Sequence, residues 1–371
     1  MKKIRIAILT RTTTLNFGTI LQNYALQSYL KDKAITVQTV DDTIPRQIYS
    51  GTKEEKRPRG LKVALANFLD RIRENRNNRE AIRIEKKICR FKKKNISYYF
   101  VTDFAKLNED FDVFIAGSDQ IWAYAAEPEF YRYFMLKEIV DEKKKLAYAV
   151  SVGEPGSREE WIADAKRLLP RFHALSVREE ASKENISPYV EKAIDVVCDP
   201  VFLLGREQWG ALAGKGLKMK GEYIFGYFLS DNEWYYEYLD RIAAALGYEV
   251  HLFRREKKSA KGDGYVKAGI ESPEAFLSAI RNAKFVITDS YHCLIFSIIF
   301  QREFVVLQRY PNENCTQNSR LTELLSRIGA EDRYFSRGTP LSTGQLHTEY
   351  SLEKLEKWID FSKKFLNDNL S

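Results

Sequence analysis

The stretch that decides the fold runs from Lys284 to Phe300 and reads KFVITDSYHCLIFSIIF. Its first part is a β-branched apolar run typical of a buried strand, and from His292 on it is an apolar run of helical type. A strand followed directly by a helix is the repeating unit of parallel sheets that helices cover on both faces. The pattern therefore places a short polar segment, beginning at Asp289, where a strand ends and a helix begins.

The same alternation of strand-like and helix-like segments extends over most of the chain. Strand-like runs include IRIAIL, FDVFIAG, KLAYAVSVG, YIFGYFLS, YEVHLF and EFVVLQR, and helical spacing of apolar residues follows most of them. A glycine-rich, basic passage at 205–221 divides the chain. We therefore predict an α/β protein with two Rossmann-like domains, residues 1–204 and 221–345, followed by an amphipathic helix over 351–370.

The composition is that of a globular protein from a reducing compartment. With 371 residues and 44% hydrophobic residues, the chain is long enough for two packed domains. Its four cysteines are scattered without a C-x-x-C pair, which favours reduced thiols and argues against a structural zinc site. The apolar run at 4–9 is too short for a signal peptide, and no stretch approaches the roughly 20 residues that span a bilayer. We therefore expect a cytoplasmic protein.

The positive charge of the chain is concentrated in residues 51–95. This segment holds 16 Lys/Arg against 6 Asp/Glu, whereas the rest of the chain has a net charge of −2. Its apolar residues have helical spacing, so we predict a basic helical insertion in the first domain. The insertion either presents a solvated charged surface or makes a peripheral contact with anionic lipid headgroups or a polyanionic acceptor. We expect no nucleic acid as a partner, because no nucleic-acid-binding motif accompanies the charge.

The polar segment after the strand at 285–288 is the first candidate site. Ligands of open parallel sheets bind at the carboxyl ends of strands, where helix N-termini attract anions. Ser290 has the side chain of a helix cap, and His292 in the first turn is suited to binding an anion or transferring a proton. The alternative is that these residues have structural roles alone: Asp289 or Ser290 caps the helix, and His292 is a polar residue at the boundary between the core and solvent.

Two further strand ends carry polar side chains. In FDVFIAGSDQIW, Gly117 lets the backbone approach a ligand closely, and Ser118 and Asp119 follow it. Asp119 is either a base toward a hydroxyl or a cap of the next turn. In ALSVREEAS, Arg178 follows a strand and either clamps a carboxylate or phosphate or pairs with a neighbouring glutamate, Glu179 or Glu180.

The loop TTTLNFGTILQNYALQ precedes the first helix, and we include Asn16 and Gly18 among the candidate substrate-binding residues. The loop matches neither the dinucleotide-binding nor the P-loop pattern. The chain also lacks an H-E-x-x-H motif and a G-x-S-x-G nucleophile elbow. The sequence therefore gives no support to a metal-dependent mechanism or a serine nucleophile.

Together, these motifs resemble the polysaccharide pyruvyl transferase family. The matching segments are NFGTILQNYALQSYL, GSDQIW, LSVREEAS, CDPVFLL and ITDSYHCLIFSIIF, in this order and spacing, within residues 4–330. The resemblance implies a GT-B-like fold in which the two Rossmann-like domains face each other across a cleft. It also implies a donor bound in that cleft, and we expect the first domain to form the acceptor side and the second the donor and phosphate side.

The resemblance further implies the substrates and the site residues. The donor would be phosphoenolpyruvate, a co-substrate rather than a cofactor, and the acceptor a glycan or lipid-linked sugar. The family's Ser-x-His pattern falls on Ser290, Tyr291 and His292, its arginine on Arg178 and its acidic residue on Asp119. One departure is Cys293, where family members commonly have glycine; its side chain would narrow the donor pocket.

Residue chemistry suits such a donor, since a phosphate and a carboxylate call for a helix N-terminus and a cationic side chain. In this interpretation His292 binds the phosphate and serves as acid, and Asp119 positions or deprotonates the acceptor hydroxyl, although the two roles are exchangeable. Arg178 would hold the anionic groups of the donor. Arg309 and Arg320 are further candidates for phosphate contacts or are ordinary surface arginines. The alternative functions are a GT-B glycosyltransferase with a nucleotide-sugar donor and a catalytically silent binding protein.

Overall fold

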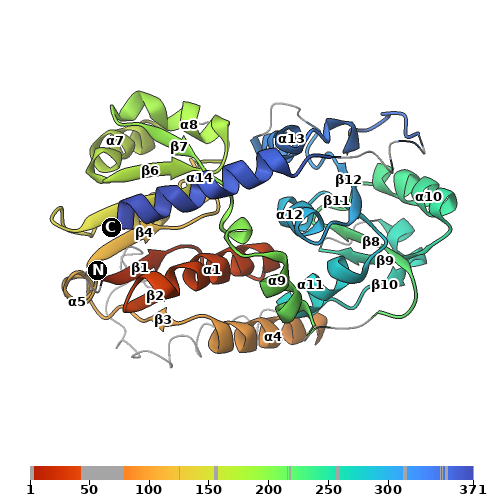
Figure 1. Ribbon diagram of the computed structural model, residues 1–371, viewed down its shortest axis with the longest axis horizontal. Helices are drawn as coiled ribbons and strands as arrows, with labels where there is room; N and C mark the ends of the chain where they lie inside the picture. The colour runs from red at the N-terminus through yellow and green to blue at the C-terminus, as the bar shows by residue number, and fades with distance from the viewer. Residues whose placement is uncertain are drawn as a thin grey trace. The chain divides into compact units, whose positions relative to one another are not determined.

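Figure 1 shows the computed structural model of the chain. The structure describes residues 4–42, 79–124, 126–153, 158–214, 216, 219–255, 259–311, 316–342, 344, 346 and 350–370. The first part of the predicted basic insertion, residues 51–78, lies outside the described residues. Two compact units form: the first contains Met1–Leu203 and Ile359–Ser371, and the second contains Leu204–Trp358.

The first unit is built on a seven-stranded sheet with the order β3-β2-β1-β4-β5-β6-β7, and every pairing is parallel. Its strands are β1 (Arg5–Leu9), β2 (Thr36–Val40), β3 (Tyr98–Tyr99), β4 (Val113–Ala116), β5 (Lys144–Val150), β6 (Ala174–Val177) and β7 (Ile194–Val196). All four residues of the central strand β4 are buried, as expected for a parallel sheet covered on both faces.

Helices connect these strands. They are α1 (Phe17–Leu30), α4 (Arg79–Asn95), α5 (Phe104–Asp110), α6 (Pro128–Phe134), α7 (Glu159–Leu168) and α8 (Glu180–Ile186), with 3-10 turns at Lys31–Lys33, Leu169–Arg171, Ser187–Tyr189 and Pro200–Leu203. The described part of the basic insertion is thus a helix, α4, as the sequence predicts. The C-terminal helix α14 (Glu353–Leu370) contains residues of both units and lies within the region where the sequence predicts an amphipathic helix.

The second unit has a six-stranded sheet with the order β10-β9-β8-β11-β12-β13, again with parallel pairings only. Its strands are β8 (Tyr223–Phe228), β9 (Glu249–Arg254), β10 (Val266–Lys267), β11 (Phe285–Thr288), β12 (Glu303–Leu307) and β13 (Tyr334–Phe335). Its helices are α9 (Arg206–Ala213), α10 (Trp234–Leu246), α11 (Pro273–Asn282), α12 (Tyr291–Ile299) and α13 (Thr316–Ile328), with 3-10 turns at Ala260–Gly264 and Glu331–Arg333.

Both sheets confirm the predicted fold class, an α/β chain with two Rossmann-like halves. In each sheet the strand order reverses beside the first strand, next to β1 in one unit and next to β8 in the other. Ligands of such sheets bind outside the carboxyl ends of the strands at this switch point. The ends of β1 and β4, and those of β8 and β11, are therefore where a site is expected in each unit.

Candidate active site

The junction between β11 and α12 forms as its sequence predicts. α12 starts at Tyr291, and Ser290 caps it, because its Oγ accepts a hydrogen bond from the backbone nitrogen of Cys293 at 3.4 Å. The helix is buried along almost its whole length, which holds its N-terminus in place. His292 lies in the first turn with 7% of its surface exposed. The N–H groups and the positive dipole end at this position favour an anion.

Asp289, the residue before the cap, connects two strand ends. Its carboxylate accepts hydrogen bonds from the backbone nitrogens of Leu229, at 2.7 Å, and Ser230, at 2.9 Å, directly after β8. Burial raises the pKa of the Asp289 carboxyl, because the charged form loses its water, and these two backbone bonds offset part of the effect. The alternative that Asp289 caps the helix is therefore wrong: it joins the ends of β8 and β11, and Ser290 is the cap.

Two arginines lie close to the same junction. The Nε of Arg309, which follows β12, donates a hydrogen bond to the Ser230 hydroxyl at 3.1 Å. Arg320 of α13 places its guanidinium carbon 5.6 Å from the ring centroid of Tyr291. Both side chains are partly exposed. The structure thus brings five predicted residues of the second unit together: Ser290, Tyr291, His292, Arg309 and Arg320.

In the first unit the end of β4 is tightly packed. A Cβ on Gly117 would lie 3.0 Å from the Cβ of Thr10, so the close approach that requires glycine here is to Thr10. Ser118 is completely buried, and its carbonyl oxygen accepts a hydrogen bond from the Thr10 hydroxyl at 2.9 Å. In this conformation Gly117 and Ser118 therefore support the end of the strand from inside.

Asp119 has an unusual backbone conformation, with a φ of 91°. A non-glycine residue in the left-handed region costs about 1–3 kcal/mol and persists only when its surroundings enforce it. Its carboxylate accepts hydrogen bonds from the Thr19 hydroxyl at 2.6 Å and from the Gln120 backbone nitrogen at 2.9 Å, and its carbonyl accepts one from Ser151 at 3.0 Å. The side chain remains 17% exposed, so this carboxylate is both positioned and accessible.

Arg178 is surrounded by carboxylates. Its side chain is completely buried, with Nη1 3.0 Å from the Asp199 carboxylate and Nε 3.4 Å from that of Glu179. Its Nη2 lies 4.0 Å from a carboxylate oxygen of Asp119. The sequence predicted an ion pair of Arg178 with Glu179 or Glu180. The pair with Glu179 forms, and Asp199 is an additional partner. Because the guanidinium has no exposed surface, it holds Asp119 and its neighbours rather than presenting its charge to a ligand in this conformation.

The loop between β1 and α1 completes this region. Asn16 caps α1 by accepting a hydrogen bond from the Gly18 backbone nitrogen at 2.9 Å. The preceding part of the loop is fixed by Asp42, whose carboxylate accepts bonds from the backbone nitrogens of Thr12, at 3.0 Å, and Thr13, at 3.1 Å. Thr19, which binds Asp119, is in the first turn of α1. The switch point of the first unit thus positions one accessible carboxylate.

The motifs at both switch points are those of one family. A sequence model described as polysaccharide pyruvyl transferase matches residues 16–309, from the cap of α1 to the arginine after β12. The chain belongs to the polysaccharide pyruvyl transferase family. Among curated proteins, none matches this sequence.

Solved structures with a similar chain path include enzymes of sugar-nucleotide chemistry. A UDP-N-acetylglucosamine 2-epimerase is 11% identical, with coverage of 100% of this chain and 90% of that chain and a TM-score of 0.49. The S. aureus MnaA–UDP complex is 10% identical, with coverage of 99% and 97% and a TM-score of 0.48. The E. coli ADP-heptose lps heptosyltransferase II is 11% identical, with coverage of 99% and 98% and a TM-score of 0.37. At these sequence identities and TM-scores, the similarity says nothing about the activity of this protein.

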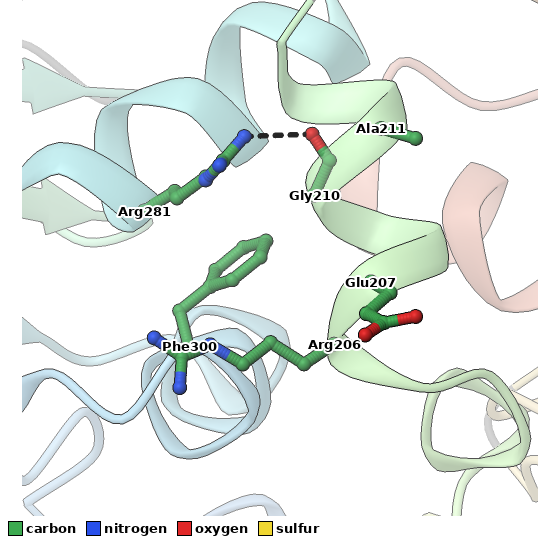
Figure 2. Close-up of a pocket in the computed structure, with 6 residues that line it drawn as sticks. All are labelled: Arg206, Glu207, Gly210, Ala211, Arg281 and Phe300. Atoms are coloured by element: carbon green, nitrogen blue, oxygen red, sulfur yellow. Dashed lines mark hydrogen bonds between the residues drawn. The ribbon is translucent and has the colours of Figure 1, made fainter.

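The second unit of this pyruvyl transferase family member contains a cavity of about 630 Å³ (Figure 2). It is lined by Arg206, Glu207, Gly210, Ala211, Arg281 and Phe300. Arg281 donates a hydrogen bond to the Gly210 carbonyl at 2.8 Å, and Arg206 donates one to the Gln301 side chain at 2.7 Å. A cationic side chain near a helix C-terminus binds the carbonyl groups there, which explains the position of Arg281, and Arg206 is held by the Gln301 side chain. The cavity contains none of the candidate site residues.

Three residues that sequence reasoning did not select take part in the sites: Thr19, Asp199 and Ser230. Asp199 and Ser230 both follow strands, β7 and β8, so the rule about strand ends would have found them. Thr19 lies inside a helix, and only its hydrogen bond to Asp119 reveals it. Among the described residues, no group of three His, Cys, Asp or Glu side chains is placed to hold a metal ion. Within the same residues, no helix is long and apolar enough to cross a membrane.

Proposed function

We propose that this protein transfers a pyruvyl group from phosphoenolpyruvate to two hydroxyls of one sugar, forming a cyclic ketal. The acceptor is a glycan or a lipid-linked sugar of surface polysaccharide synthesis, and the reaction takes place in the cytoplasm. Family membership supports the transferase class. The donor, the acceptor and the location are the part that we propose.

The observation that carries the proposal is the α12 N-terminus. It combines the positive end of the helix dipole with the imidazole of His292 and the nearby guanidinium groups of Arg309 and Arg320. Phosphoenolpyruvate has a phosphate and a carboxylate on adjacent positions, and such anions are bound by helix N-termini and guanidinium groups. Asp289 keeps this arrangement rigid by joining the strand ends beneath it.

The chemistry requires one acid and one base. Protonation of C3 of phosphoenolpyruvate turns its methylene into a methyl group and makes C2 electrophilic, so that a sugar hydroxyl adds to C2 and loses its proton. The C2–O bond to phosphate then breaks, and the second hydroxyl adds to C2 and also loses its proton. One molecule of donor and one diol thus give one ketal and one phosphate.

In our proposal, His292 binds the phosphate and supplies the proton, and Asp119 accepts the proton of the attacking hydroxyl. Asp119 suits the second role because Thr19 and Arg178 position it while part of it remains exposed. Arg178 acts through Asp119 and supports its negative charge. Asn16, Gly18 and the strand-end residues Gly117 and Ser118 shape the surroundings of this carboxylate.

The decisive experiment incubates the protein with phosphoenolpyruvate and a panel of aryl glycosides and lipid-linked sugars. Phosphate release and product mass are measured together. We expect equal amounts of phosphate and of a product heavier by one pyruvyl ketal. Phosphate release without a ketal product would contradict the proposal.

A thermal shift assay separates the proposal from the nucleotide-sugar alternative. A ligand that binds only the folded state raises the melting temperature, and the rise grows with the logarithm of the ligand concentration relative to its Kd. We expect phosphoenolpyruvate to raise it and nucleotide sugars to have little effect. The reverse pattern would favour a glycosyltransferase, and no shift with either donor would favour a binding protein without activity.

A further inference from the structure

Helix α4 (orange in Figure 1) has a strongly cationic exposed side. Six of its basic residues are exposed and fall within about 120° of the helix circumference, at 100° per residue, so that they share one face. These residues, called the α4 cationic face below, are Arg83, Lys86, Lys87, Arg90, Lys93 and Lys94.

The opposite side of α4 is anchored in the first unit. Ile88 and Phe91 are each only 1% exposed, and the Phe91 ring meets the Tyr24 ring of α1 edge to face, with centroids 5.9 Å apart. Lys92, on this anchored side, donates hydrogen bonds to the carbonyl groups of Thr12 and Thr14. The helix is therefore held to the same loop that leads into the candidate site, and its orientation is defined.

The charges of this face are arranged differently from those of other exposed helices. On α5, Lys106 pairs with Asp110 at 2.7 Å, and on α14, Lys357 pairs with Glu353 at 2.6 Å. By contrast, four cations of the α4 face form no ion pair with any described residue: Lys86, Arg90, Lys93 and Lys94. The acidic side chain of α4 that the structure describes, Glu85, is 5% exposed and so lies off the cationic face.

We infer that the α4 cationic face docks this protein on a bilayer that contains anionic lipids. The face extends over 12 residues, about 17 Å of helix, which matches an extended charged surface rather than a single anion. Each Lys or Arg near such a surface strengthens binding about fivefold. Because the chain outside residues 51–95 has a net charge of −2, the attraction would also orient the molecule.

A bilayer fits this face better than a nucleic acid does. Proteins that bind single strands combine cationic residues with aromatic side chains on which the bases stack. The α4 cationic face contains no aromatic residue. The inference does not depend on the proposed reaction, but it would place the site loop near a lipid-linked acceptor.

The test is co-sedimentation of the full-length protein with vesicles of phosphatidylcholine alone or mixed with phosphatidylglycerol. The variant replaces Lys86, Arg90, Lys93 and Lys94 by Gln. The matched control replaces four exposed lysines elsewhere, Lys166, Lys354, Lys357 and Lys364, and so removes the same charge. Circular dichroism and pyruvyl transfer to a water-soluble aryl glycoside show whether each variant is folded and active.

We expect the unmodified protein and the control to bind anionic vesicles, with binding that weakens as salt rises, and neither to bind neutral vesicles. The α4 variant should bind anionic vesicles at least about a hundredfold more weakly while its transfer to the soluble acceptor is unchanged. Equal binding by the variant, or equal loss in the control, would overturn the inference. Failure of the unmodified protein to bind anionic vesicles would also overturn it, and binding of duplex DNA in that case would identify a nucleic acid as the partner. None of these outcomes would bear on the proposed reaction, which the soluble acceptor tests separately.

Discussion

The carboxylate of Asp289 lies 2.7 Å from the backbone nitrogen of Leu229, and this hydrogen bond joins the ends of β11 and β8 beneath the α12 N-terminus. The two residues are 60 positions apart in the chain. In the second unit, Ser290, Tyr291 and His292 follow one of these two strand ends, Arg309 follows β12 beside them, and Arg320 is on α13. The geometry of the proposed anion site therefore depends on a contact that involves no ligand.

Replacing Asp289 by Asn should destabilise the protein. The amide group would offer only one acceptor oxygen, so either the Leu229 or the Ser230 nitrogen would face a donor in a buried position. Leaving a buried donor without a partner costs about 1–3 kcal/mol. A chemical denaturation experiment on both proteins measures this difference. Unchanged stability would show that the β8 loop finds other partners.

The same pair of proteins gives a prediction about pH. The pKa of Asp289 is raised in the folded state, so the folded state binds more protons there than the unfolded state. The contribution of this carboxyl is therefore most favourable below its unfolded pKa of about 3.9 and falls as pH rises through the folded pKa. The stability of the unmodified protein relative to Asp289→Asn should decrease over that window. A difference that is independent of pH would contradict the raised pKa.

His292→Ala should lower pyruvyl transfer by about 10² to 10⁴, the usual contribution of a general acid or base. The variant should still fold, because the imidazole, although only 7% exposed, lies in the first turn of a helix that other residues hold in place. His251→Gln, a change on β9 that leaves the candidate site untouched, is the control. Steady-state kinetics and a thermal melt measure both effects. Full activity in His292→Ala would remove this residue from the mechanism.

Asp119→Gly and Asp119→Ala form an informative pair. Both remove the carboxylate, so both should be inactive in the transfer assay. Only glycine adopts the φ of 91° without strain, so the Gly variant should be about 1 kcal/mol more stable than the Ala variant. Thermal melts of the two proteins measure this difference. Equal stability would mean that the backbone changes its conformation when the carboxylate is absent.

Arg178→Met tests a buried ion-pair network. From the sequence alone, the loss of Arg178 should abolish transfer with little effect on stability. The structure changes this expectation, because removing one member of a buried network leaves charged partners behind, here Asp199 and Glu179, and costs about 3–5 kcal/mol. The exposed pair Arg241–Glu237 provides the control, since Arg241→Met should cost at most about 0.5 kcal/mol.

Local sequence signals predicted the elements and their ends. The alternation of apolar runs identified the parallel α/β architecture, and the polar residue before an apolar helix identified Ser290 as a cap. These features depend on residues within a few positions of one another, where backbone geometry and side-chain chemistry are sufficient. The strand-end rule then selected His292, Asp119 and Arg178 from the chain.

The sequence by itself therefore determined the order of strands and helices, the family and the side chains at the strand ends. Tertiary structure alone decided which of these side chains meet. In the folded protein Arg178 is buried against Asp199, and the Thr19 hydroxyl donates a hydrogen bond to Asp119. Asp289 accepts a hydrogen bond that joins the ends of β11 and β8. The reason is physical: these contacts join residues between 21 and 100 positions apart, and no local propensity encodes which strand ends become neighbours. Only the packing of whole sheets brings those charges and hydrogen-bonding groups together.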